Sequence, residues 1–408
     1  MQGYASKSIV QKKQMQKFLK LVKDTLLEYQ YTPSRIIDVG GADGVLAKAL
    51  KNSYPHAYVV CLDKDQDLIK EGEKKWEGIE FICKDFLDFK AEGVFDLVVS
   101  TNTYHWFDGR WLKAIENTFD ILEEGGWFFL HQGGRWTYHF LYVLGEEIYE
   151  ELTGRKLKHT DILYYPTLRE FRERLSEFFS VIDAFSKIEL SEDYNLEELI
   201  KSFSVAGAKV FLDVLDKSLH EKFLKLLQER ALELEVPVFG RRLYAIARKR
   251  LNPVIRRGRL SEIEWLIEKY EHEFVPPLSQ RGSAGGELKG GSLEQYLKSL
   301  LSSEILIAEK DQKVIACLCY QKRVLFFTKH PVAYVSTVIV DKPYRRTGVA
   351  KALYKELISK EKQVYVRTWS SNHSHIKLLL DLGFKPAYRV KDERGKGEDT
   401  IYYSYEGT

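Results

Sequence analysis

The sequence predicts an α/β protein of two domains, and three observations lead to this expectation. The chain has 408 residues, more than twice the usual length of one domain. Residues 33–250 alternate short β-branched runs with amphipathic stretches, which is typical of βαβ units around a parallel sheet. A charged segment that ends in proline, residues 248–253, separates this pattern from a second set of strands and helices. We therefore predict domains at residues 1–252 and 253–408.

Seven strands and a helical cap are expected in the first domain. The strands are predicted at residues 35–39, 57–62, 79–83, 95–100, 126–131, 181–190 and 242–247. Residues 138–175 have mixed aromatic and helical character without a strand signal, so we interpret them as a cap inserted after the fifth strand. Helices at 196–203 and 218–234 separate the last two strands.

The second domain is expected to mix strands and helices in an α+β arrangement. A helix is predicted at 261–274, with Ser261 as its N-cap, and the Gly-, Pro- and Ser-rich residues 276–292 favour a mobile surface loop. Further strands are predicted at 305–309, 313–321, 333–340, 363–368 and 399–405, and further helices at 347–360 and 372–382.

Composition excludes several classes of protein. Hydrophobic residues make up 44% of the chain and charged residues 30%, which rules out a disordered chain and a fibre. The net charge is only +3, so it requires neither a nucleic-acid nor a membrane partner. The lysine-rich amino terminus lacks the apolar core of a signal peptide, and no window resembles a membrane span, so we expect a cytoplasmic protein.

The four cysteines are expected to be buried free thiols. They are too few for a disulfide framework, and none has the C-x-x-C spacing that favours zinc. No metal site is therefore predicted. The residues concerned are Cys61, Cys83, Cys317 and Cys319.

Residues 35–44 place a strand, a turn of small residues and a helix start in succession. Open α/β sheets bind nucleoside-containing ligands at such a point. Gly40 and Gly44 let the backbone approach a ligand closely. Asp63 ends the next strand, where a carboxylate can accept hydrogen bonds from both ribose hydroxyls.

The motif Asp38-x-Gly40-x-Ala42-x-Gly44 resembles the first motif of class I S-adenosylmethionine-dependent methyltransferases, with Ala42 in place of the middle glycine. The resemblance covers residues 30–250, and residues 102–107 and 122–126 look like the small-molecule branch, including carboxyl methyltransferases. It implies a Rossmann-like sheet and S-adenosylmethionine as cofactor. The cofactor-binding residues that it implies are Asp38, Gly40, Gly41, Ala42, Gly44, Asp63, Asp85, Phe86 and Ser100.

Methyl transfer is an in-line displacement that requires alignment above all, and it requires a base only for a protonated amine or a weakly acidic hydroxyl. His105 and Tyr104 follow the fourth strand and are the candidates for substrate contact or proton transfer. The alternative for His105 is packing beside Trp106. Arg135, after the fifth strand, is either a contact to an anionic acceptor or a solvated side chain.

Residues 333–350 lead a strand through a basic turn into a helix. Backbone N–H groups at such a helix start form a nest for a diphosphate, and the arginines of the turn add positive charge. The run Arg345-x-x-Gly348-x-Ala350 resembles the signature of Gcn5-related N-acetyltransferases (GNAT). The resemblance covers residues 254–405 and implies a first strand at 254–257. Leu382-Gly383-Phe384 fits the same family.

This resemblance implies acetyl-coenzyme A as the second cofactor. The residues that it implies are Val338, Val340, Arg345, Arg346, Thr347, Gly348, Val349, Ala350 and Asn372. Leu379 stands where many members have a tyrosine acid, so His375, His373 or a chain of waters is the expected substitute.

The function expected from both resemblances is a bifunctional transferase, with methyl transfer to N or O and N-acetyl transfer to a small-molecule or amine acceptor. One alternative is an RNA- or protein-modifying pair, because residues 253–408 carry a net charge of +7. The other alternative is a cofactor-binding regulatory module in which Ala42 and Leu379 mark reduced catalysis. The acceptors and the oligomeric state do not follow from the sequence.

Overall fold

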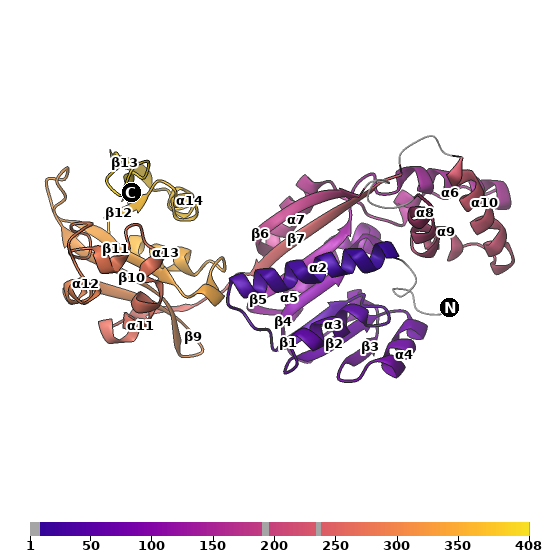
Figure 1. Cartoon of the computed structure of the whole chain (residues 1–408), viewed down its shortest axis with the longest axis horizontal. Coiled ribbons are helices and arrows are strands. Elements are labelled where there is room, and N and C mark those ends of the chain that lie inside the picture. Colours follow the sequence, from indigo (N-terminus) through magenta and orange to yellow (C-terminus); the bar gives the residue numbers. More distant parts are fainter. Residues whose placement is uncertain (1–8, 190–195, 234–237, 408) are drawn as a thin grey trace. The chain divides into compact units, whose positions relative to one another are not determined.

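The computed structural model describes residues 9–189, 196–233 and 238–407, which divide into two compact units, residues 1–250 and 251–408 (Figure 1). The division lies two residues before the predicted boundary. Each unit is built on one sheet of seven strands.

The first unit has the predicted Rossmann-like sheet, in the order β3-β2-β1-β4-β5-β7-β6. The first five strands in this order run parallel, and β7 is antiparallel to both of its neighbours. The chain crosses over between β3 and β4, so the sheet changes direction of winding between β1 and β4. The strands are β1 (Arg35–Val39), β2 (Tyr58–Asp63), β3 (Glu80–Cys83), β4 (Phe95–Thr101), β5 (Leu122–Gly133), β6 (Phe179–Glu189) and β7 (Gly240–Lys249).

Helices cover both faces of this sheet, and its strands are accordingly apolar on both sides. One apolar layer contains Phe18, Val22 and Leu50, and the opposite layer contains Trp111 and Phe171. The helices of the first layer are α2 (Ile9–Glu28), α3 (Val45–Ser53) and α4 (Gln66–Lys75), and those of the second are α5 (Trp111–Ile121) and α7 (Leu168–Phe178).

The cap differs from the predicted segment 138–175. Tyr142, Phe203 and Phe211 form the centre of an apolar cluster separate from the sheet, whereas α7 packs on the sheet through Phe171 and Leu175. An amphipathic pattern shows that a helix has a buried face but not which surface it covers, so the sequence misplaced α7. The cap helices, grouped in Figure 1, are α6 (His139–Thr153), α8 (Leu196–Val205), α9 (Lys209–Leu212) and α10 (His220–Leu232).

The second unit has the strand order β13-β14-β12-β11-β10-β9-β8. Its neighbouring strands are antiparallel except for β11 and β12, which run parallel. The prediction missed β13, because every residue of this edge strand is at least partly exposed and no apolar alternation marks it. The strands are β8 (Val254–Arg257), β9 (Glu304–Lys310), β10 (Lys313–Arg323), β11 (Val332–Val340), β12 (Gln363–Trp369), β13 (Lys385–Val390) and β14 (Thr400–Glu406).

Two helices lie on each face of the second sheet. Ser261 is not the N-cap that was predicted, because the first of these helices already begins at Leu260. The carboxylate of Glu262 instead accepts a hydrogen bond from the backbone N–H of Arg259, at 2.7 Å. The helices are α13 (Val349–Lys360) and α14 (His373–Asp381) on one face, and α11 (Leu260–Tyr270) and α12 (Leu293–Leu300) on the other.

Residues 276–292 are packed, so the prediction of a mobile surface loop is wrong. Leu278 and Ala284 belong to the apolar core beneath α11, and Arg281 forms a β-bridge with Gly290. The glycine and proline content indicated that these residues connect two elements. It could not show that buried side chains hold the connection in place. One cysteine also differs from its prediction: Cys83 is exposed, whereas the other three cysteines are buried free thiols.

Candidate cofactor sites

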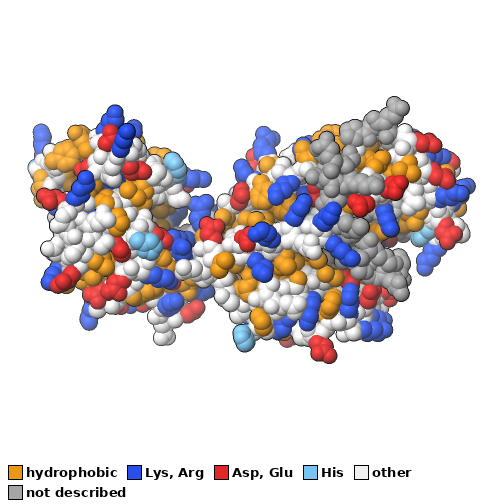
Figure 2. Space-filling model, in the orientation of Figure 1, with side chains coloured by type: hydrophobic (Ala, Val, Ile, Leu, Met, Phe, Trp, Pro, Cys, Tyr) orange, Lys and Arg blue, Asp and Glu red, His pale blue; other side chains and the backbone are white. Residues whose placement is uncertain are grey.

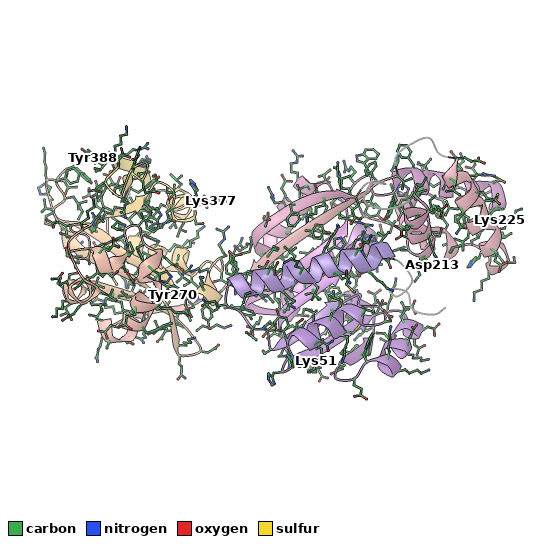
Figure 3. The ribbon with its side chains drawn as sticks, in the orientation of Figure 1. Lys51, Asp213, Lys225, Tyr270, Lys377 and Tyr388 are labelled. Atoms are coloured by element: carbon green, nitrogen blue, oxygen red, sulfur yellow. The ribbon has the colours of Figure 1, made fainter. Side chains whose placement is uncertain are left out.

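A cavity of about 450 Å³ opens at the carboxyl ends of β1, β2 and β4 in the first unit. This volume lies in the range of small-molecule and cofactor sites. The turn after β1 and the end of β2 line it, and the cap contributes Lys209 and Asp213, of which Asp213 is labelled in Figure 3. Lys209 also forms an ion pair of 3.6 Å with Asp65, which joins the cap to the segment after β2.

The turn after β1 approaches its surroundings too closely for larger residues. Gly40 has φ +71°, and a Cβ there would lie 2.1 Å from Thr103 Oγ1. A Cβ on Gly41 would lie 2.6 Å from Cys61 Sγ. The backbone N–H groups of both glycines donate to the carbonyl of Leu62, at 2.7 and 3.1 Å. The turn is therefore held against β2, with its backbone lining the cavity.

Asp63 is held at the cavity by two backbone groups. One carboxylate oxygen accepts a hydrogen bond from the N–H of Ala42 and the other from the N–H of Asp65, each at 2.9 Å. A carboxylate oxygen has more than one lone pair, so Asp63 keeps acceptor capacity for a ligand hydroxyl. This geometry suits the predicted contact to ribose.

Asp38 lies buried beneath the same turn. Burial is the main cause that raises its pKa to about 8, and the charge of Asp63 adds to the effect. At neutral pH its carboxyl group is therefore mostly protonated. The carboxylate of Asp63 then lies near a neutral carboxyl group rather than near a second charge.

The remaining residues predicted for the first cofactor divide into two groups. Asp85 and Phe86 line the cavity, and the Asp85 carboxylate accepts from the N–H of Leu87 at 2.9 Å, which fixes this loop. Gly44 and Ser100 are not among the residues that line it. Ser100 Oγ instead donates to Val39 O at 2.7 Å and so joins β4 to β1 below the site.

Ala42 adopts φ +50°, a conformation that alanine tolerates less well than glycine. We expect Ala42→Gly to raise the free energy of unfolding by about 0.5 to 1 kcal/mol, because glycine removes the strain at some cost in chain entropy. Urea denaturation would measure the change. Ala47→Gly, within α3, is the control and should lower stability instead. An Ala42→Gly protein no more stable than the wild type would show that the turn is not strained.

The two predicted catalytic residues of the first domain do not line the cavity, so both predictions need correction. Tyr104 is fully buried in the sheet core, with its hydroxyl group bonded to that of Thr118, and burial raises its pKa. The ring of His105 stacks on Tyr165. Burial, aided by the charge of Arg242, lowers the pKa of His105 to about 3. Both residues follow β4, as predicted, but their side chains pack among buried aromatic rings instead of lining the cavity.

The sequence reasoning missed a buried polar network next to the cavity. Asn102 lines the cavity and accepts from Arg242 at 3.4 Å. Arg242, which is 6% exposed, also donates to the carboxylate of Glu189 at 3.2 Å and to the hydroxyl of Tyr138 at 3.1 Å. β7 contains three arginines and a lysine, so charge within the strand did not single out Arg242. By contrast, Arg135 is exposed and paired with Glu170.

In the second unit, β11 and β12 separate part of the way along their length. They pair from Ala333 to Val335 on β11, opposite Val364 to Val366, and the described ladder between them ends there. Beyond this point β11 pairs with β10, and β12 pairs with β14. The backbone of residues 336–340, which includes the predicted Val338 and Val340, therefore presents one edge to a ligand.

The turn before α13 provides a nest of backbone N–H groups. Gly348, at φ +93°, is the N-cap of α13, and a Cβ there would have no described heavy atom within 4 Å. Arg346 is exposed, and the hydroxyl of Thr347 donates to Tyr344 O at 2.6 Å. The first turn of α13 contains Val349 and Ala350. This arrangement fits the diphosphate of coenzyme A.

Arg345 has a different position from the one predicted. Its guanidinium forms an ion pair with Glu273 at 2.8 Å, donates to Val340 O at 2.9 Å and stacks on Tyr270. The side chain thus braces the turn against the segment after α11, and its role as a phosphate ligand is not supported. The contact with Glu273, which is distant in the sequence, determines the position of the Arg345 side chain.

His375 is also unsuited to its predicted role as a substitute for the tyrosine acid. Its two ring nitrogens lie 2.8 Å from the Tyr354 hydroxyl and 3.2 Å from the Thr368 hydroxyl, and burial lowers its pKa to about 4. Asn372 caps α14 by accepting from the N–H of His375. Leu379, in the place of the tyrosine, is fully buried in the core.

Fold and sites together define a two-domain transferase, and comparisons with known proteins agree. Residues 11–197 match the family model described as "Methyltransferase domain", and residues 266–384 match that of the "Acetyltransferase (GNAT) family". The chain thus carries a methyltransferase domain followed by a GNAT domain. Both assignments confirm the predicted cofactors at the level of the family, S-adenosylmethionine for the first and acetyl-coenzyme A for the second.

Curated relatives match the first domain. A malonyl-[acyl-carrier protein] O-methyltransferase of Geobacter sulfurreducens is 33% identical over 134 residues, 31% of this chain and 46% of that protein. A second one, of Ilyobacter polytropus, is 23% identical over 202 residues, 48% of this chain and 73% of that protein. The chain thus spans about half the length of the first relative. The N-methyltransferase NodS of Bradyrhizobium japonicum, solved with S-adenosyl-L-homocysteine, is 15% identical with a TM-score of 0.36, over 60% of this chain and 89% of that one.

Proposed function

We propose that the chain is a bifunctional transferase that methylates one acceptor in its first domain and acetylates an amine in its second. The observation that carries the proposal is that each unit has a built cofactor site of its own. One is the cavity with Asp63 and the glycine turn, and the other is the nest at Gly348 beside the parted strands. S-adenosylmethionine supplies an electrophilic methyl group when bound, and acetyl-coenzyme A supplies the acetyl group.

For the first domain we propose a carboxyl oxygen as methyl acceptor. No histidine is among the residues that line the described cavity, and the two predicted bases are buried away from it. A carboxylate is already deprotonated at neutral pH and therefore needs no base. The names of the curated relatives, which are malonyl-[acyl-carrier protein] O-methyltransferases, support the same acceptor class. The role of the chain is then to align the acceptor and to exclude water.

For the second domain we propose transfer to a neutral amine. Neither His375 nor Leu379 offers a side-chain acid or base, so orientation and desolvation of the amine remain as the contributions of the protein.

Basic and acidic side chains are interspersed on the face of both units shown in Figure 2, which gives no support to the RNA-modifying alternative. Within the described residues, every helix is too short or too polar to cross a membrane.

Both activities can be tested in one experiment on the full chain. Cell extract is incubated with the protein and with methyl-labelled S-adenosylmethionine and acetyl-labelled acetyl-coenzyme A, and products are found by mass spectrometry. We expect new masses that carry a labelled methyl group, a labelled acetyl group, or both. Tight binding of both cofactors without any labelled product would support the regulatory module instead.

We expect Asp63→Ala to weaken S-adenosylmethionine binding by about 1 to 3 kcal/mol, because it removes a charged hydrogen-bond acceptor from the cavity. Binding of acetyl-coenzyme A should not change. Titration calorimetry measures both affinities on the full chain. Asp67→Ala, two residues beyond Asp65 and outside the cavity, is the control and should bind both cofactors normally. Unchanged binding of the methyl donor to Asp63→Ala would remove Asp63 from the site.

A further inference from the structure

Three arginines converge in the second unit away from the nest at Gly348. Arg281 and Arg394 are 4% and 8% exposed, and both donate to the same carbonyl oxygen, that of Val275. The third, Arg367, donates to the carbonyl of Gly286 at 2.6 Å. Three segments distant in sequence, namely residues 275–286, β12 and the connection between β13 and β14, thus bring three positive charges together.

The described partners of these arginines are neutral. Arg281 donates to Pro276 O at 3.0 Å and to Val275 O at 3.3 Å, and Arg394 donates to Thr400 Oγ1 at 2.9 Å. The acidic group that influences Arg367 and Arg394 is Glu393, but among the described residues it forms no ion pair within 4 Å, and its Oε2 has no hydrogen-bond partner. Buried charges in folded proteins are ordinarily paired, so the cluster lacks its counter-ion.

Two further features indicate that the missing group belongs to a ligand. The hydroxyl of Tyr334, a residue only 1% exposed, has no hydrogen-bond partner in the described chain. Burial lowers the pKa of Arg394 to about 9, and repulsion by Arg281 and Arg367 adds to the effect. Loop anchoring by itself requires hydrogen-bond donors but no charge, and neutral donors would be less costly to bury.

The position of the cluster identifies its ligand as part of the acetyl acceptor. Tyr334 and Arg367 flank the point where β11 and β12 part, after the pair Val335 and Val366. Tyr334 precedes Val340 by six residues along β11, which corresponds to roughly 20 Å of strand. The cluster is therefore far from the nest that suits the diphosphate of coenzyme A, and it lies at the other end of the proposed cofactor groove.

We propose that Arg281, Arg367, Arg394 and the Tyr334 hydroxyl bind an anionic group of the amine acceptor, so that the second domain acetylates amines that carry a carboxylate or a phosphate. The inference rests on the proposed acetyl transfer for the role of the ligand, but the anion site itself does not. Gly285 allows this arrangement, because a Cβ there would lie 2.4 Å from the Tyr334 ring. The loop can therefore close over the tyrosine.

Binding is tested first, on the full chain saturated with coenzyme A so that the nest is filled. Calorimetric titration with malonate and with inorganic phosphate should show that at least one of them binds. Arg394→Gln should weaken that binding by about tenfold to a hundredfold, as expected for loss of a charged hydrogen-bond donor. Arg389→Gln is the matched control, because Arg389 is an exposed arginine five residues away that pairs with Asp399, and it should bind normally.

Acetylation then distinguishes the two anions. The release of coenzyme A thiol is measured with 4-aminobutyrate, 3-aminopropylphosphonate and the neutral 4-aminobutanamide. One of the anionic amines should exceed the amide in kcat/KM by about tenfold or more, and Arg394→Gln should remove this preference. The anion that is preferred shows whether the acceptor is a carboxylate or a phosphate.

Failure of this inference and failure of the proposed function give different results. Binding of neither anion by the wild-type protein, or equal binding by wild type and Arg394→Gln, would overturn the anion site. Anion binding without acetylation of any amine would leave the site standing and overturn the acetyl transfer. If Arg394→Gln does not fold, Arg367→Gln takes its place, because that side chain is less buried.

Discussion

Gly348→Glu is expected to abolish acetyl-coenzyme A binding, with a loss of affinity of about a hundredfold or more. The new carboxylate would enter the nest before α13 and repel the diphosphate. A side chain is strained at the φ of +93° that Gly348 adopts, but the surrounding space is open and an acidic group near a helix amino terminus is favourable, so the variant should still fold. Titration calorimetry on the full chain measures the loss, and S-adenosylmethionine affinity should stay within twofold of the wild type.

Gly348→Ala is the matched control for this prediction. Alanine at this position has the same strain of a side chain at φ +93° but adds no charge, so Gly348→Ala should retain most of the affinity. The converse lesion is Gly40→Glu, which should remove the methyl-donor site and spare acetyl-coenzyme A binding, because the two sites belong to separate sheets. Normal acetyl-coenzyme A binding by Gly348→Glu would refute the assignment of the nest.

The second large effect is expected from the buried network behind the methyl-donor cavity. Arg242→Met should lower the free energy of unfolding by about 3 to 5 kcal/mol, because it removes the cation beside the buried carboxylate of Glu189 and leaves the Tyr138 hydroxyl without this donor. It should also weaken methyl transfer, since Asn102 at the cavity loses its contact to the guanidinium. Chemical denaturation and initial rates measure the two effects.

A double-substitution cycle separates the ion pair from packing. Arg242→Met combined with Glu189→Gln removes both charges, so the double variant should be more stable than Arg242→Met alone. Arg241→Met, at the preceding and more exposed position of β7, is the control and should change stability by less than about 1 kcal/mol. If Arg242→Met unfolds with the stability of Arg241→Met, the network does not support the site.

Much of the fold could be predicted from local pattern. The strands at residues 35–39, 95–101 and 332–340 are found where apolar runs predicted them. The turn at Gly40 is also where the small residues placed it, because glycine tolerates both its positive φ and its close approach to Thr103. These features depend on residues close together in the chain, and short-range sterics determine them.

Tertiary structure decided which side chains face a ligand. Tyr104 and His105 have the right position after β4, yet both are buried, and Arg345 turns to Glu273 rather than to the nest. The clusters around Arg242 and around Arg281 assemble from segments more than 50 residues apart, so no local pattern in the sequence predicts them. Sequence by itself determined the two sheets and their glycine turns. The burial and charge pairing of each functional side chain depend on contacts that exist only once distant segments have packed together.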